Sequence, residues 1–496
     1  MAADNISYPF YNSQSSSASS SKSSSSSSIN LMEKEEKEEK LKNQFEIRDF
    51  ESKIINAIDI VDIVHAHGYK IHEHIVQTKD GYLLAIHRII PKHIIRSSVK
   101  SRSYTAQLRD LNQPVVYFHH GLLTNSELFV LGDKTTKCLP FVLADSGYDV
   151  WLGNNRGNKY SRKHLELSSS SAAFWNYSLD EFALYDIPDT IEYILEATRQ
   201  ESLNYIGFSQ GSAQCLAALS LSPKLNEKIK LFIGLSPAMV PRGLNHPVAS
   251  FFVDSAPSFL YNLFGCRALI PSVVFWQQLL GPKYYRTVVD NSLILLFGWQ
   301  TKNISSKQKQ LGYQHMFSPS SVKSVVHWFQ IIRSKRFQMY DEGGNAGSKL
   351  NTFSKNHKVY RVASFPTQTI STPMLLVYGK ADCLIDIETT LENSSCHVET
   401  IGIENYEHMD TLWADEVETT VFQPVIKKLE EVNKKGNTNL KKTGVLVNGG
   451  LKFDKIRQPP VSDINNETIR ASSFSSSSSP INNRTMSAGE SISNHA

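Results

Sequence analysis

The sequence predicts an α/β protein in which helices cover both faces of a mostly parallel β-sheet. One observation is a series of short apolar runs rich in Val, Ile, Leu and Tyr, bounded by Gly, Pro and Asn, which are typical of buried strands. These runs are residues 82–90, 114–120, 148–154, 203–209, 230–237 and 374–379. The second is that helical patterns lie between several of them, as in 178–200, where Phe182, Ile191 and Ile194 mark one apolar face and Pro188 indicates a kink or a new first turn. Alternation of this kind favours a parallel sheet, because parallel strands are joined by helical crossovers.

Composition sets the limits on function. The chain has 496 residues, enough for one large domain or two medium ones. Its net charge of +4 is mild, and no basic stripe interleaved with aromatic residues is present, so a nucleic-acid partner is not expected. Its five cysteines are odd in number and lack C-x-x-C spacing, which argues against a disulfide framework or a zinc site and indicates a reducing compartment.

Both ends of the chain differ from its middle. Residues 13–28 are almost entirely Ser, and 33–42 alternate acids and lysines, which forms a solvated helix at most. We therefore expect disorder over 1–54 and, in a similar Ser-rich tail, over 433–496, with the folded body at 55–432. No basic stretch followed by an apolar one begins the chain, so no secretory signal is expected and an intracellular location is predicted.

The tail carries two motifs of another kind. Arg470 and Arg484 are each followed within three residues by serine, the spacing that basophilic kinases prefer. Kinase sites are one interpretation, and Ser-rich disorder without function is the other. Phosphorylation there would add negative charge and weaken contact with an anionic lipid surface.

One segment interrupts the alternation of strands and helices. No comparable unit follows 230–237 until about residue 373. The segment between holds runs rich in Phe, Trp, Leu and Tyr at 248–282 and 292–299, broken by prolines and charges, so that none reaches the ~18–20 apolar residues of a membrane span. It is either a buried helical insertion or a lid whose apolar face covers a lipid-binding cleft and rests on a lipid surface.

The stretch YIGFSQGSAQ contains a candidate nucleophile. Gly207-Phe208-Ser209-Gln210-Gly211 fits G-x-S-x-G, and it lies between an apolar strand and a helical pattern. That context is the nucleophile elbow of α/β-hydrolases, where the two glycines make room for a sharp turn. The motif is short enough to arise by chance, so its interpretation depends on partners elsewhere in the chain.

A serine nucleophile needs a base and a carboxylate, which follow it in the order Ser, Asp or Glu, His. Asp382 comes directly after the strand 374–379, and Asp386 is the nearby alternative. The histidines downstream are His397, His408 and His495. His397 begins a strand pattern and His495 lies in the tail, whereas His408 lies in a loop that enters a helix. Asp382 and His408 are therefore the candidate partners of Ser209.

Donors for an oxyanion are also present. The strand 114–120 ends in His119-His120-Gly121-Leu122, where the glycine permits a turn that aims a backbone N–H into the site. The candidate donors are the N–H groups of Leu122 and Gln210. Adjacent histidines cannot easily ligate one ion and no third ligand has suitable spacing, so neither a metal nor a cofactor is expected.

Together these motifs resemble the acid lipase family, which includes gastric lipase and lysosomal acid lipase. The resemblance is carried by HHGLLTNSELFV, GYDVWLGNNRGNKYSR, FWNYSLDEFALYDIPDTIEYI, YIGFSQGSAQ, HWFQIIRSKRFQMYD and YEHMDTLW, and it covers residues 62–425. It implies an α/β-hydrolase fold, the triad Ser209, Asp382 and His408, and a helical cap over an acyl-chain pocket at about 240–365. The GFSQGSAQ variant and the polar tails most resemble the fungal steryl ester hydrolases.

The resulting expectation is a serine hydrolase of long-chain fatty-acid esters, with steryl esters as the preferred substrate. A triacylglycerol lipase of the same fold is the first alternative, and a catalytically silent lipid-binding or droplet-surface protein is the second. The expected location is the cytosolic side of a lipid droplet or endoplasmic reticulum membrane, with attachment through the cap or another surface.

Overall fold

The computed structural model describes residues 21–92, 94–95, 112–244, 247–270, 273–342, 362–392 and 394–434. The first 20 residues, most of the predicted tail, His495 and both arginine–serine motifs lie outside these ranges. What the sequence predicts for them stays a prediction.

A nine-stranded sheet forms the centre of the described chain, in the order β1-β2-β4-β3-β6-β7-β10-β11, with β5 paired to β2. The strands are β1 (Lys70–Gln77), β2 (Tyr82–Ile90), β3 (Val115–His119), β4 (Asp149–Leu152), β5 (Lys163–His164), β6 (Leu203–Phe208), β7 (Ile229–Leu235), β10 (Met374–Gly379) and β11 (Val398–Ile403). β2 pairs antiparallel with β1, β4 and β5. The pairs along β4-β3-β6-β7-β10-β11 are all parallel. The predicted mostly parallel sheet is confirmed.

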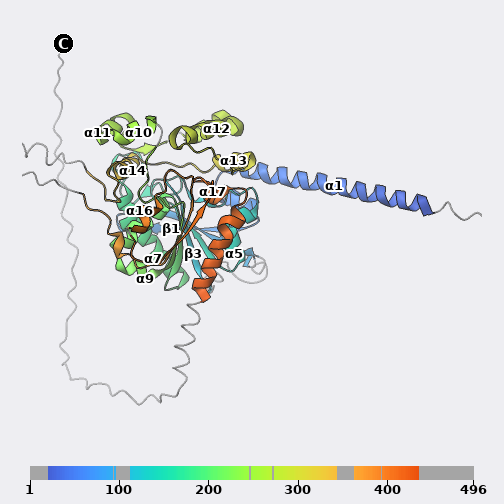
Figure 1. Ribbon diagram of the computed structural model, residues 1–496, viewed down its shortest axis with the longest axis horizontal. Helices are drawn as coiled ribbons and strands as arrows, with labels where there is room; N and C mark the ends of the chain where they lie inside the picture. Colours follow the sequence, from blue (N-terminus) through green and yellow to red (C-terminus); the bar gives the residue numbers. More distant parts are fainter. Residues whose placement is uncertain are drawn as a thin grey trace, which may run out of the picture. The chain divides into compact units, whose positions relative to one another are not determined.

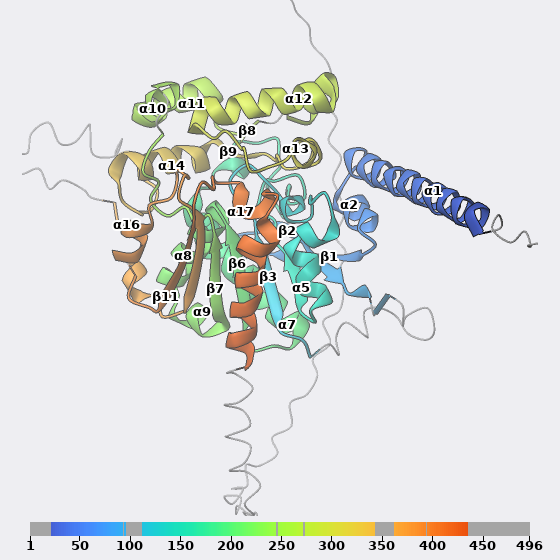
Figure 2. The same ribbon diagram turned by 45° about the vertical axis from the view of Figure 1, so that its right-hand side comes forward.

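The two faces of the sheet bury separate cores, because successive side chains of a strand point in opposite directions. On β3, Val116 and Phe118 join a cluster formed with α5 (Leu139–Asp145) and the helical residues 423–434. Val115 and Tyr117 join a second cluster on the other face. That face is covered by α7 (Ile187–Thr198) and α8 (Gln210–Leu221). Figures 1 and 2 show these helices flanking the strands.

The helical segment predicted at 178–200 has three parts. The short helix α6 (Leu179–Glu181) is capped by Ser178, a π-helical turn follows over Phe182–Asp186, and α7 begins at Ile187. Pro188 lies in the first turn of α7, directly after the π-helical turn. The predicted new first turn is confirmed. Other body helices are α2 (Ile60–Ala66), α9 (Pro223–Lys228), α16 (Ile387–Glu392) and α17 (Asp410–Trp413).

The N-terminal segment contains a helix, α1, over Ser21–Ile55, which includes the charged residues 33–42 for which a solvated helix is the most that the sequence predicts. The domain bounds 1–54 and 55–432 stay a prediction. The acids and lysines are spaced four residues apart, and pairs such as Lys34–Glu38 and Asp49–Lys53 support a helix by a few tenths of a kcal/mol each. Its end is anchored, because the fully buried Ile54 packs in the core beside α2.

The segment after β7 is a helical insertion. Its helices are α10 (Pro247–Asp254), α11 (Pro257–Phe264), α12 (Val273–Phe297), α13 (Ser306–Tyr313) and α14 (Val322–Ser334), with a ribbon of β8 (Ala268–Leu269) and β9 (Ser320–Ser321). In Figures 1 and 2, α10, α11 and α12 lie side by side on the far side of α14 from the sheet. Gly281 interrupts α12 with a φ of 68°. Within the described residues, no helix is both long and apolar enough to span a bilayer.

His327 connects the insertion to the body. It is fully buried on α14, where its Nε2–H donates to Gln338 O at 2.9 Å and its Nδ1 accepts from Leu179 N at 3.3 Å. Burial lowers the pKa of His327 from the ordinary 6.5 to about 4. The neutral imidazole therefore joins α14 to the start of α6.

This burial predicts a specific dependence of stability on pH. As pH falls from 6.5 to 4, the unfolded chain takes up a proton at residue 327 that the folded chain does not, so stability is lost across that window. Between pH 6.5 and 4, we expect the free energy of unfolding to fall less in His327→Gln than in wild type. The two decreases should differ by on the order of 3 kcal/mol. Urea unfolding at a series of pH values measures this difference. Parallel pH curves for His327→Gln and wild type would contradict the prediction.

Candidate active site

Ser209 occupies the sharp turn between β6 and α8. Its φ is 53° and its ψ is −119°, a positive-φ conformation that residues with a side chain rarely adopt. The turn is held by Ser209 N, which donates to Leu235 O on the neighbouring strand β7 at 3.0 Å. Strain of this kind, in a turn at the carboxyl end of a central strand, is the geometry of a nucleophile elbow.

The two flanking glycines leave no room for side chains. A Cβ on Gly207 would lie 2.6 Å from Ser212 N, and a Cβ on Gly211 would lie 2.2 Å from His119 O. Both obstacles are backbone atoms, which cannot rotate away. The motif is therefore required by the packing of α8 against β6 and against the end of β3.

Asp382 and His408 lie in contact. Nδ1–H of His408 donates to Oδ2 of Asp382 at 2.6 Å, and Oδ1 of Asp382 accepts from Leu384 N at 3.0 Å. Both side chains are buried, with exposed fractions of 4%. Asp386, the alternative carboxylate, instead accepts from Thr389 N at 3.1 Å in the first turn of α16. The arrangement fixes one tautomer of His408 and leaves its Nε2 to act as a base.

Strand order brings these loops close to Ser209. The strands β6, β7, β10 and β11 are consecutive neighbours, and Ser209, Asp382 and His408 all follow the carboxyl end of a strand. The Phe208 ring contacts the His408 ring, with centroids 5.1 Å apart. Neither Ser209 Oγ nor His408 Nε2 makes a hydrogen bond to any described residue, so these two atoms are not hydrogen-bonded to each other in the structure. Catalytic hydrogen bonds are often long until substrate binds.

The loop after β3 passes directly beside this turn. A Cβ on Gly121 would lie 3.1 Å from Cβ of Ser209. The N–H groups of Leu122 and Gln210 donate no hydrogen bond to any residue in the described part of the chain, and Gln210 is the first residue of α8. Two unpaired donors and a helix N-terminus, groups that attract negative charge, therefore lie beside the turn at Ser209.

His119 and His120 hold this loop through hydrogen bonds. Nδ1–H of His120 donates to Gly121 O at 2.8 Å, and its Nε2 accepts from Asn155 N at 3.1 Å and Asn158 Nδ2 at 3.2 Å. Nε2–H of His119 donates to Asn155 Oδ1 at 2.8 Å. Burial lowers the pKa of His119 to about 3 and that of His120 to about 4, so both stay neutral. The described residues hold no cluster of three or more metal-ligating side chains.

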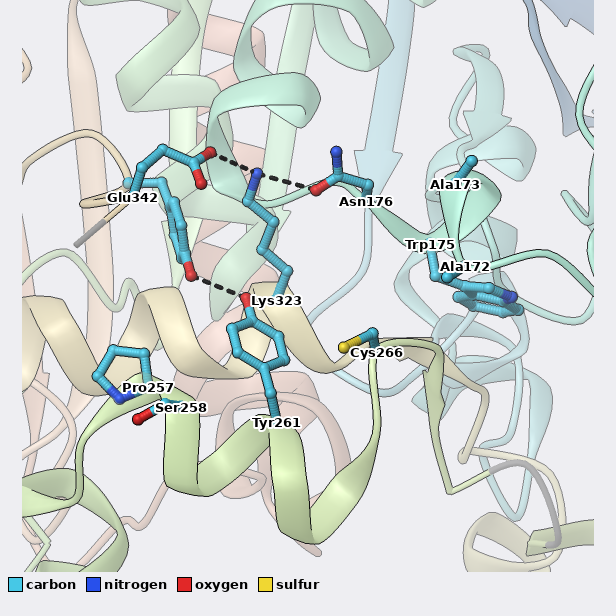
Figure 3. Close-up of a pocket in the computed structure, with 11 residues that line it drawn as sticks. Ala172, Ala173, Trp175, Asn176, Pro257, Ser258, Tyr261, Cys266, Lys323 and Glu342 are labelled. Atoms are coloured by element: carbon cyan, nitrogen blue, oxygen red, sulfur yellow. Dashed lines mark hydrogen bonds and ion pairs between the residues drawn. The ribbon is translucent and has the colours of Figure 1, made fainter. Parts of the chain in front are cut away.

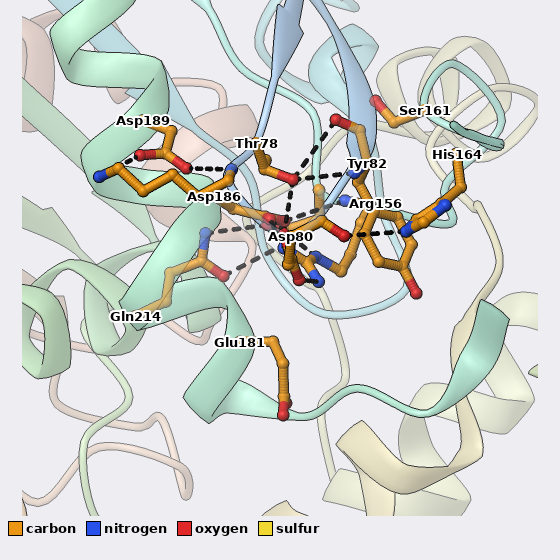
Figure 4. A network of polar contacts seen from close by, with 12 residues as sticks. Thr78, Asp80, Tyr82, Arg156, Ser161, His164, Glu181, Asp186, Asp189 and Gln214 are labelled. Atoms are coloured by element: carbon orange, nitrogen blue, oxygen red, sulfur yellow. Dashed lines mark hydrogen bonds and ion pairs between the residues drawn. The ribbon is translucent and has the colours of Figure 1, made fainter. Parts of the chain in front are cut away.

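A buried charge network holds the loop that supplies these asparagines. Figure 4 shows Arg156 between two carboxylates: its Nε–H donates to Asp186 Oδ1 at 2.7 Å, and its Nη1–H donates to Asp80 Oδ2 at 2.5 Å. The guanidinium also lies over the Tyr82 ring, 4.0 Å from its centroid. Asp80 lies in the β1–β2 turn and Asp186 in the π-helical turn. The loop is thereby tied to two distant parts of the body.

Two tryptophans of the insertion reach the site, and the sequence patterns did not single them out. The ring of Trp299, just after α12, is parallel to that of His408, with centroids 4.9 Å apart. Trp328 on α14 donates its indole N–H to Oε1 of Gln210 at 2.7 Å. Both contacts join residues that are far apart in the chain, and local sequence periodicity does not encode such contacts.

A cavity of about 680 Å³ lies elsewhere, between α11, α14 and residues 172–176 (Figure 3). Lys323 crosses it, with Nζ donating to Asn176 Oδ1 at 3.1 Å and Glu342 Oε1 at 2.9 Å. Beside it, the Tyr261 and Tyr340 hydroxyls lie 2.7 Å apart. Neither the candidate triad nor the loop after β3 lines this cavity, so it is separate from the site at Ser209.

Comparison with known proteins identifies relatives over the same body. Residues 114–415 match the α/β hydrolase fold family, and 60–133 match its partial α/β-hydrolase lipase region. A probable lipase of Schizosaccharomyces pombe is 47% identical over 372 residues, covering 75% of this chain and 80% of that protein. Human gastric triacylglycerol lipase is 31% identical over 389 residues, covering 76% and 92%. The rat enzyme of the same name is 32% identical over 385 residues, covering 75% and 92%.

Proposed function

The chain belongs to the acid lipase family of α/β-hydrolases and is a carboxylic ester hydrolase, and from this premise we propose that Ser209, Asp382 and His408 carry its reaction. The observation that supports the proposal most is the buried contact of 2.6 Å between Asp382 and His408, beside a serine in a positive-φ turn. We also propose that the hydrolase domain spans 55–432 and that its cap spans about 240–365.

The proposed reaction is acyl transfer through two steps. His408 Nε2 accepts the proton of the Ser209 hydroxyl as its oxygen attacks the ester carbonyl, while Asp382 holds the Nδ1–H tautomer and stabilises the imidazolium. The N–H groups of Leu122 and Gln210 receive the oxyanion. His408 then protonates the leaving alcohol, and a water deprotonated by His408 hydrolyses the acyl-enzyme.

Asp382 and Asp386 provide a matched pair of variants. We expect Asp382→Asn to lower kcat by about 10⁴-fold, because an amide at this position cannot hold the productive tautomer of His408. Asp386→Asn should stay within about 2-fold of wild type, since that carboxylate only caps α16. Turnover of a soluble short-chain ester measures both. Equal losses in the two variants would contradict the assignment of Asp382.

The proposed substrate class is steryl esters of long-chain fatty acids. The likeness of the GFSQGSAQ motif to fungal steryl ester hydrolases and the apolar insertion support it, because large apolar ligands need pockets with hydrophobic walls. The gastric relatives are named triacylglycerol lipases, which makes trioleoylglycerol the alternative substrate. The alternative from another class is a silent lipid-binding protein that keeps the fold.

A substrate panel separates these possibilities. We expect wild type to hydrolyse a steryl oleate with the highest kcat/KM, ahead of trioleoylglycerol and a short-chain ester, and to react with a fluorophosphonate probe at Ser209. Ser209→Ala should lose both labelling and turnover by several orders of magnitude. Faster turnover of trioleoylglycerol would favour the lipase alternative. Absence of labelling in folded wild-type protein would favour the silent one.

We further propose that the insertion rests on a lipid surface, such as the cytosolic side of a droplet or of the endoplasmic reticulum membrane. The outer helices α10, α11 and α12 expose large apolar side chains, which are unusual on a surface that faces only water. They include Phe251, Phe259, Leu263, Leu279, Tyr284 and Val288. The three helices that carry these residues lie side by side in both views of the molecule (Figures 1 and 2).

Flotation with phosphatidylcholine-coated triolein emulsions tests this surface. The double variant Phe251→Ser and Leu279→Ser should partition at least about 10-fold less, because each side chain gains about 1.5–3 kcal/mol when fully buried in apolar surroundings. Turnover of a soluble short-chain ester should not change. Leu165→Ser is the matched control, since Leu165 is equally exposed at 58% but lies on the body. Equal partition of the double variant and wild type would contradict the proposal.

A further inference from the structure

We propose that Trp299 is a positioning residue, which fixes the plane of the His408 imidazole so that its Nε2 faces Ser209. The proposal rests on His408 being the base of the reaction proposed above. Trp299 belongs to the insertion, not to the body that carries the three triad residues. It would therefore make proton transfer depend on how the insertion is seated.

The rings form a continuous stack. The Trp299 and His408 planes differ by 4°, with centroids 4.9 Å apart, and Phe297 stacks on Trp299 at 4.3 Å and 18°. The Phe208 ring contacts the imidazole at 54°. Trp299 is 5% exposed, so its ring is held by packing. Offset-stacked aromatic pairs gain free energy beyond the area they bury.

The carboxylate alone does not determine the ring plane. The hydrogen bond from Nδ1–H to Asp382 fixes one corner of the imidazole, but the ring can still roll about that corner and carry Nε2 with it. A flat surface parallel to the ring opposes this roll. Trp299 provides that surface, and Phe208 limits the ring from a second direction.

The loop that carries Trp299 is bonded to the chain neighbours of both Asp382 and His408. The Glu407 carboxylate accepts from Gln300 N at 2.9 Å and from Thr301 N at 2.7 Å. The Cys383 thiol donates to Phe297 O at 3.3 Å. Thr301 holds a φ of 50° in this arrangement, which is strained for a β-branched residue. The tryptophan is thus placed relative to the acid and the base, and not merely packed near them.

The same loop continues α12. This helix ends at Phe297, and its outer surface exposes Leu279, Tyr284 and Val288. A displacement of α12 would move the stack, and with it the plane of the imidazole. The insertion therefore contributes to the acid–base step as well as to the contact with lipid.

The test compares two substitutions at Trp299 on a soluble short-chain ester, with active sites counted by fluorophosphonate titration to its end point. We expect Trp299→Leu to lower kcat per titrated site by about 10- to 100-fold, since a misplacement of about 1 Å can cost about 100-fold in rate. KM should stay within about 2-fold. Trp299→Phe keeps a flat ring and should stay within about 3-fold of wild-type kcat.

The controls separate positioning from stability. Phe337→Leu breaks another buried aromatic pair, with Phe365 at 4.8 Å, and should reduce the number of titrated sites without changing kcat per site. Should Trp299→Leu yield no folded protein, Glu407→Gln releases part of the same loop and should lower kcat per site by about 3- to 10-fold.

The contrary outcomes are distinct. Wild-type kcat per site in Trp299→Leu, or a change confined to KM, overturns this inference, as does wild-type kcat in Glu407→Gln where that variant is needed. If Ser209→Ala keeps wild-type turnover, the proposed function itself fails. If Ser209→Ala is inactive while Trp299→Leu is unimpaired, only the role of Trp299 fails.

Discussion

The strained turn at Ser209 is the constraint on which the rest of the site depends. A positive φ at a residue with a side chain costs on the order of 1–3 kcal/mol, so the surroundings must hold it. Leu235 O accepts the Ser209 N–H, and the close approach of Gly211 to His119 O locks the helix start against β3. Because that contact involves the residues just before Gly121, the turn at Ser209 and the loop after β3 are positioned by one packing interaction.

The buried polar groups next to that contact are either neutral or paired with an opposite charge. His119 and His120 are buried where a positive charge would be costly, and they stay neutral while satisfying the loop carbonyl and the asparagines. The positive charge of Arg156 nearby is matched by the carboxylates of Asp80 and Asp186. A buried ion pair of this kind contributes little net stability, yet losing one partner leaves an uncompensated charge. Its value here is to fix the loop from 154 to 158.

The sequence predicted those features that local patterns encode. The central strands could be recognised from apolar runs and the first turn of α7 from Pro188, because a strand buried on both faces and a proline each leave a local signature. The closeness of Asp382 and His408 could also be anticipated, since residues after neighbouring parallel strands meet at one sheet edge. The helix α1 extends beyond the charged residues 33–42 at which a solvated helix was considered, and its buried end at Ile54 is a tertiary contact that composition does not encode. The contacts of Trp299 and Trp328 follow only from the tertiary fold.

The insertion cannot be regarded as a cover added to a complete enzyme. Trp299 lies on the imidazole, and Trp328 holds the Gln210 side chain whose residue supplies a candidate oxyanion donor, so the insertion contacts both ends of the proposed reaction path. Trp299 lies in the loop after α12 and Trp328 lies on α14, and α13 separates the two helices in the chain. A body without the insertion would keep the strained turn, which depends on β3, β6 and β7, but would lose the surfaces that orient His408 and Gln210. The same segment therefore contributes to catalytic geometry and to lipid contact through different side chains, Trp299 and Trp328 inside and Phe251 and Leu279 outside.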